Sequence, residues 1–64
     1  MGKIRRHGYV FFAWKGDHDP RHVHIYRKGE FVLKWDLENN RPMAGHPTRK
    51  LVELIRQLQE EGLI

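Results

Sequence analysis

Apolar and polar residues alternate along the first half of this chain, and apolar residues recur with a helical period near its end. An aromatic run over residues 9–14, bounded by glycine-containing turns, indicates a strand. The stretches 22–26 and 30–37 alternate in the way typical of half-buried strands. Over residues 48–61 the spacing predicts a helix with four inward positions, Leu51, Leu54, Ile55 and Leu58.

The turn between the second and third of these strands decides which side chains face the core, because a shift of one residue exchanges the two faces. A two-residue loop, Lys28-Gly29, would pair Tyr26 with Phe31 and mix apolar with polar residues on each face. A three-residue loop over 27–29 brings the apolar residues together, and we predict that register. The helix then packs on Val23, Ile25, Phe31, Leu33 and Trp35, and the far face carries His22, His24, Tyr26, Lys34 and Asp36.

These elements predict one α+β domain over residues 1–64, a three-stranded antiparallel sheet with one C-terminal helix packed on one face. Residues 38–47 are expected to form a connecting loop. A chain of 64 residues without cysteine lies near the lower size limit for a core that needs no staples. The seven aromatic residues can supply the missing buried area, and part of their surface could form a homodimer face.

The charge pattern suits a polyanionic partner. The formal net charge is +4, and the basic residues come in groups near residues 3–7, 27–28 and 41–50. A solvated basic surface without a partner is the alternative. No apolar run has the length of a membrane span and no secretory signal pattern follows the basic start, so we expect a cytoplasmic protein that does not bind membranes.

Three histidines and two aspartates lie within eight residues, in the order Asp17-His18-Asp19-Pro20-Arg21-His22-Val23-His24. Imidazole transfers protons near neutral pH and is also the commonest metal ligand. His22 and His24 would project from the same side of a strand, close enough to contact one phosphate or one metal ion. Three interpretations stay open: proton transfer at a phosphate by His22 and His24, a metal site drawn from Asp17, His18, His22 and His24, or a shaped turn followed by exposed histidines.

The predicted helix begins with basic residues and ends with acidic ones, opposite to the preference of the helix dipole. A bound phosphate would offset that arrangement, since free N–H groups at a helix start attract anions. The candidate nucleic-acid contacts are Tyr26, Lys34, His46, Arg49 and Lys50. The chain has neither serine nor cysteine and no glycine-rich phosphate loop, which disfavours acyl transfer and nucleoside-triphosphate chemistry, and we expect no cofactor.

The segment from Tyr9 to Trp35, with its Asp-His-x-Pro-x-His-Val-His pattern after an aromatic strand, resembles a family of small bacterial proteins known as domain of unknown function, serial four-one-six-zero. Members commonly have a second proline where this chain has Arg21, and many have a longer C-terminal helix. Genes of this family often lie beside another small gene, which implies a toxin–antitoxin pair and a small cognate partner protein.

The order of strands, histidines and helix is also similar, more faintly, to the HicA messenger-RNA interferase toxins, although those have a leading helix that this chain lacks. The two resemblances imply an RNA-directed module of toxin–antitoxin type, with His22 or His24 as general acid or base if the protein is an enzyme. Lys34, Arg49 and Lys50 would then stabilise the phosphate. The alternative is a non-catalytic module that binds a protein or a divalent metal.

Overall fold

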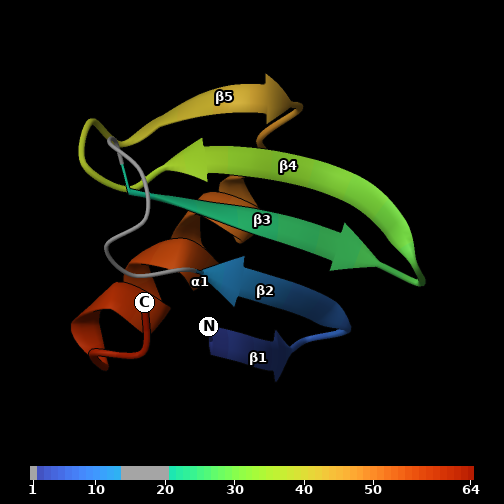
Figure 1. Cartoon of the computed structure of the whole chain (residues 1–64), viewed down its shortest axis with the longest axis horizontal. Coiled ribbons are helices and arrows are strands. Elements are labelled where there is room, and N and C mark those ends of the chain that lie inside the picture. Colours follow the sequence, from blue (N-terminus) through green and yellow to red (C-terminus); the bar gives the residue numbers. More distant parts are fainter. Residues whose placement is uncertain (1, 14–20) are drawn as a thin grey trace.

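A computed structural model describes residues 2–13 and 21–64 of the chain as a five-stranded sheet with one helix across one of its faces (Figure 1). The strands follow one another in chain order, and every neighbouring pair is antiparallel. The elements are β1 (Gly2–Arg6), β2 (Tyr9–Ala13), β3 (His22–Arg27), β4 (Glu30–Asp36), β5 (Arg41–Gly45) and α1 (Arg49–Glu60). In the described part of the chain, no helix has the length and apolar character needed to cross a membrane.

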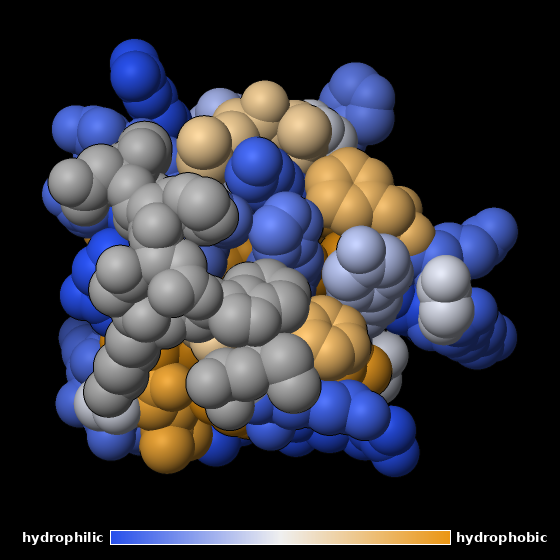
Figure 2. Space-filling view, viewed as in Figure 1, coloured by the Kyte–Doolittle hydropathy of each residue, from blue (hydrophilic) through white to orange (hydrophobic). Residues whose placement is uncertain are grey.

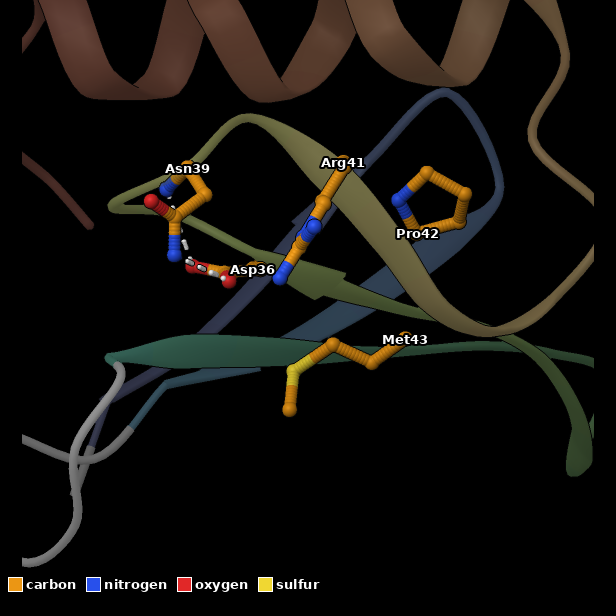
Figure 3. Close-up of a pocket in the computed structure, with 5 residues that line it drawn as sticks. All are labelled: Asp36, Asn39, Arg41, Pro42 and Met43. Carbon is orange, nitrogen blue, oxygen red and sulfur yellow. Dashed lines mark hydrogen bonds between the residues drawn. The ribbon is translucent and has the colours of Figure 1, made fainter.

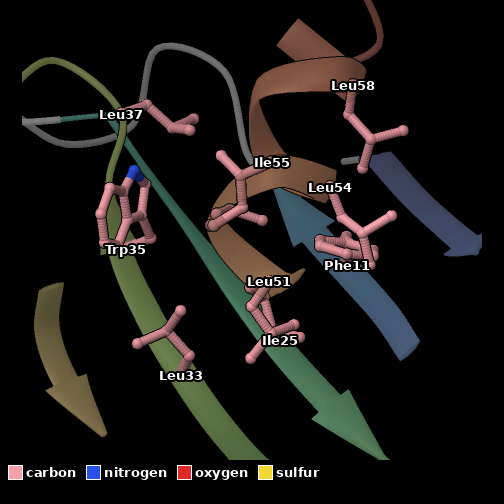
Figure 4. Close-up of a cluster of buried hydrophobic side chains, with 10 residues drawn as sticks. Phe11, Ile25, Leu33, Trp35, Leu37, Leu51, Leu54, Ile55 and Leu58 are labelled. Atoms are coloured by element: carbon pink, nitrogen blue, oxygen red, sulfur yellow. The ribbon is translucent and has the colours of Figure 1, made fainter. Parts of the chain in front are cut away.

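The core lies between the sheet and α1 (Figure 4). Each of the three central strands contributes alternate residues to it, and α1 contributes the four positions that its sequence period predicts. The buried apolar residues are Phe11, Val23, Ile25, Leu33, Trp35, Leu37, Leu51, Leu54, Ile55 and Leu58. Burial on this side alone leaves the other face of the sheet to polar and aromatic side chains.

The predicted three-stranded sheet is wrong, because a further strand lies at each edge. β1 pairs with β2 through a two-residue turn at His7-Gly8, and its alternation places Ile4 opposite Phe11. β5 lies within residues 38–47, for which the sequence predicts a loop. It contains Pro42, and all five of its residues are exposed, so no alternation of apolar and polar residues marks it as a strand. Proline is tolerated there because β5 is an edge strand.

The predicted three-residue turn between β3 and β4 is also wrong. Lys28 and Gly29 form a two-residue turn with φ values of 51° and 79°, and Arg27 pairs with Glu30. Such primed turns match the twist of the flanking strands. A bulge keeps apolar and polar residues on separate faces despite this turn. Tyr26 pairs with Phe31, but the next pair is Ile25 with Leu33, so the register shifts by one residue on β4. Phe31 therefore lies outside the predicted core and is 46% exposed.

The helix is the element that the sequence predicts best. Thr48 caps its start by accepting a hydrogen bond from the N–H of Leu51 at 3.2 Å. Its other end is tied to β1, where the guanidinium of Arg6 donates two hydrogen bonds to the Glu61 carboxylate, at 2.5 and 2.9 Å. The buried side chains of α1 hold the helix on one side of the sheet, and the opposite side is the candidate site.

Candidate nucleic-acid interface

The side of the sheet opposite α1 carries both strand histidines, and we call it the histidine face. Cross-strand partners share a face, so the strand pairing assigns its members. They form three rows across the sheet. The first row is Arg41, Asp36 and His22; the second is Ala44, Lys34, His24, Phe12 and Lys3; the third is Phe31, Tyr26, Val10 and Arg5.

His22 and His24 lie side by side on β3 as predicted. Their rings meet edge to face, with centroids 5.1 Å apart, and both residues are half-buried. Val23 between them points to the other side and is completely buried, which fixes the direction of this part of the strand. The two imidazoles are therefore held close enough for one phosphate to contact both.

His24 occupies the centre of the second row, between Lys34 on β4 and Phe12 on β2. Partial burial lowers the pKa of His24 below 6.5, and the nearby charges of His22 and Lys34 lower this pKa further. The lowered pKa favours the neutral imidazole at pH 7. A neutral imidazole beside a lysine ammonium can accept a proton while the lysine interacts with a phosphate.

Three aromatic rings follow one another across the third row and the neighbouring part of the second. Phe12 and Tyr26 meet edge to face with centroids 5.5 Å apart, and Tyr26 and Phe31 do so at 5.9 Å. The ammonium of Lys3 lies 5.9 Å from the centroid of the Phe12 ring. We call Phe12, Tyr26 and Phe31 the aromatic cluster; it adjoins His24 directly through Phe12.

The histidine face is basic. Its described side chains include one acid, Asp36, and four permanently basic groups, Lys3, Arg5, Lys34 and Arg41. Figure 2 looks onto this face and shows hydrophobic side chains with hydrophilic ones around them. The helix side carries much of the opposing charge, since Glu53 and Glu60 pair with Arg56 and Glu61 pairs with Arg6. Among the described residues, the histidine face thus has an excess of basic over acidic side chains.

Asp36 contributes one negative charge to this surface, and its carboxylate accepts hydrogen bonds in the turn between β4 and β5 (Figure 3). It is 2% exposed and accepts hydrogen bonds from the side-chain amide of Asn39 at 2.8 Å and from the backbone N–H groups of Glu38 and Asn39. The Asn39 side chain lowers the pKa of Asp36 most, and the backbone donors and Arg41 lower this pKa further. An open hollow of about 520 Å³ lies beside it, lined by Asp36, Asn39, Arg41, Pro42 and Met43.

The sheet divides the predicted nucleic-acid contacts into two groups. Tyr26 and Lys34 share the histidine face with His22 and His24. Arg49 and Lys50 begin α1, on the other side of the sheet, and His46 precedes them in an exposed segment. Thr48 already caps this helix. One phosphate at His24 therefore does not contact the helix start as well.

The predicted metal set is only partly described. Asp17 and His18 lie outside the described residues, whereas His22 and His24 lie on β3. Among residues 2–13 and 21–64, no group of three or more histidine, cysteine, aspartate or glutamate side chains could hold a metal ion. Histidine pairs alone are a weak metal signal.

Several members of the histidine face were not predicted from the sequence, namely Lys3, Arg5, Phe12, Phe31 and Arg41. The alternation of Lys3, Ile4 and Arg5 before the His7-Gly8 turn was a usable signal for a strand with two basic residues on one side. Phe31 lies on this face only because of the bulge between β3 and β4, which the sequence pattern does not reveal.

Comparison with known proteins gives no family model, no curated protein and no solved structure that matches this chain, so the resemblances drawn from its motif stay predictions.

Proposed function

We propose that this protein is an RNA-directed module of toxin–antitoxin type that acts in the cytosol, and that its histidine face binds RNA and cleaves it without a metal ion. The observation that carries the proposal is a pair of contacting imidazoles on a basic face, with His24 between Lys34 and the aromatic cluster. Basic groups supply affinity for phosphates, and aromatic rings interact with bases.

The protein need supply only proton transfer and stabilisation of the phosphate, because RNA carries its own nucleophile, the 2′-hydroxyl. Neutral His24 accepts the proton of the 2′-hydroxyl as this oxygen attacks the adjacent phosphorus. The bond from phosphorus to the 5′ oxygen breaks, and His22 acts as the general acid that donates a proton to that leaving oxygen. The products are a 2′,3′-cyclic phosphate and a 5′-hydroxyl, and Lys34 stabilises the charge that develops on the phosphoryl oxygens.

The lowered pKa of His24 supports this division of roles, since a base must be unprotonated at the working pH. Arg49 and Lys50, which we had expected to stabilise the phosphate, belong to the other side of the sheet and are left out of the step. Lys34 remains from that predicted set.

The test is cleavage of a labelled RNA by the purified protein in excess chelator, with the product end group identified. We expect a 2′,3′-cyclic phosphate product, and loss of at least roughly 100-fold in rate for His24→Ala, the lower end of what general acid–base groups contribute. His46→Ala is the matched control, because His46 is an exposed histidine that follows the end of β5 and belongs to none of the three rows. Circular dichroism checks that each variant is folded.

Unaltered cleavage by His24→Ala would overturn the catalytic assignment, as would activity that requires an added divalent metal. A metal-dependent result would favour a site that includes Asp17 and His18. If the protein neither binds nor cleaves RNA but binds its cognate small protein through the same face, the non-catalytic alternative holds.

A further inference from the structure

Phe31 is an exposed aromatic residue that the hairpin places outside the core. The bulge between β3 and β4 lets Leu33 face α1 while Phe31 stays beside Tyr26 on the opposite side. Its exposure of 46% contrasts with the 0% of Leu33, two residues later on the same strand. Bulges commonly re-aim a side chain next to a functional site.

The ring geometry supports a rigid surface rather than a loose one. Tyr26 is held between Phe12 and Phe31 by edge-to-face contacts at 5.5 and 5.9 Å. Rings that are fixed by their neighbours lose little conformational freedom when a ligand binds, which lowers the cost of binding. Exposed, ordered aromatic rings are the platforms on which proteins stack unpaired bases.

The charges around the aromatic cluster fit the backbone of a nucleic acid strand. Lys3 lies against Phe12, and Lys34 lies next to His24 in the adjacent row. Tyr26 and His24 are two residues apart on β3, about 7 Å along the strand. A base on the cluster and the phosphate of a neighbouring nucleotide at His24 can therefore belong to one extended strand.

We infer that Tyr26 and Phe31 form a stacking platform for an unpaired base, so that the histidine face selects single-stranded RNA over duplex RNA. This inference rests on the proposed function and specifies its substrate. A duplex keeps its bases stacked inside the helix, out of reach of a side chain on the sheet surface. Duplex RNA then gains only the phosphate contacts, while a single strand gains both.

The experiment measures binding of a fluorescent 2′-O-methyl oligouridine of about ten nucleotides, which resists cleavage, and of a duplex with the same modified backbone and length. We expect the single strand to bind more tightly, and Phe31→Ala to weaken its binding roughly 5- to 100-fold while changing duplex binding little. Leu63→Ala is the matched control, since Leu63 is 45% exposed near the C-terminal end and lies outside the histidine face. Phe31→Trp should retain binding and show additional quenching of tryptophan emission by the bound strand.

Equal binding of single strand and duplex, with no effect of Phe31→Ala and no added quenching in Phe31→Trp, would overturn the stacking platform even if His24→Ala still abolished cleavage. Selective single-strand binding through Phe31 without any cleavage would support the platform and overturn the catalytic step. Failure of the parent protein to bind either RNA would overturn both.

Discussion

The two faces of this sheet are built from the same strands and have opposite characters. Facing α1, β3 and β4 place Val23, Ile25 and Leu33, each 0% exposed, together with Trp35, which is 6% exposed. On the histidine face, His22, His24 and Lys34 of the same strands stay half-buried. A strand alternates its side chains by geometry, so one short sequence serves two purposes. The helix face therefore holds the buried core, and the histidine face keeps polar and aromatic side chains at the surface.

The largest expected effect is on the helix face. Phe11→Ala should lower the free energy of unfolding by about 3–5 kcal/mol, because it removes a fully buried ring and leaves a cavity. That is a large share of the roughly 5–15 kcal/mol typical of whole domains. Urea denaturation measures the loss, and a variant that stayed within 1 kcal/mol of the parent, a margin of about one third of the expected minimum, would show that Phe11 is not central to the core.

The next largest effect concerns β5, an edge strand that the sequence does not predict. Gly45 has φ of 87°, and a Cβ at this position would lie 2.3 Å from the carbonyl oxygen of Val32. Gly45→Ala should therefore cost at least about 1–3 kcal/mol and detach β5. Gly2→Ala is the control, since its added Cβ would make only an ordinary contact at 3.5 Å. Equal stability of the two variants would contradict the pairing of β4 with β5.

A smaller effect, of opposite sign, is expected at the turn between β3 and β4. Lys28 has φ of 51°, a conformation that costs most residues about 1–2 kcal/mol and that asparagine adopts more easily. Lys28→Asn should thus stabilise the protein by up to about 1 kcal/mol. A destabilised variant would contradict the two-residue turn and return the register to the three-residue form.

The smallest expected effect is a pH dependence that belongs to the histidine face. The pKa of His24 is lower in the folded protein than its ordinary 6.5, so the unfolded chain takes up a proton first as the pH falls. The contribution of His24 to stability is full above about pH 6.5 and is lost as the pH drops through the folded-state pKa. His24→Gln should flatten this part of the profile of urea midpoint against pH. A profile that keeps its shape in His24→Gln would show that His24 is not the residue responsible.

The sequence predicts the helix face of the sheet better than the histidine face, and the difference has a physical reason. Burial requires apolar residues at fixed intervals, so the helix, the central strands and most core residues could be predicted. Phe31 was an exception because the bulge breaks the period of two. The edge strands β1 and β5 were missed, since an edge strand is only partly buried and tolerates charge and proline.

The candidate site was only partly predictable because its members come from strands whose order the sequence does not state. His22, His24, Tyr26 and Lys34 were placed together from the alternation of two adjacent strands. Lys3 and Phe12 join them only through the pairing of β1 and β2 with β3. The basic residues at the start of α1 predicted an anion site there, but the sheet separates this helix start from the two histidines.

The most direct test of the central claim is an NMR titration of the isotopically labelled protein with single-stranded 2′-O-methyl oligouridine. We predict that the largest chemical-shift changes occur at Phe12, His24, Tyr26, Phe31 and Lys34, whereas the buried positions of α1 change little. Changes centred on Arg49 and Lys50, or no changes at all, would contradict the assignment of RNA binding to the histidine face.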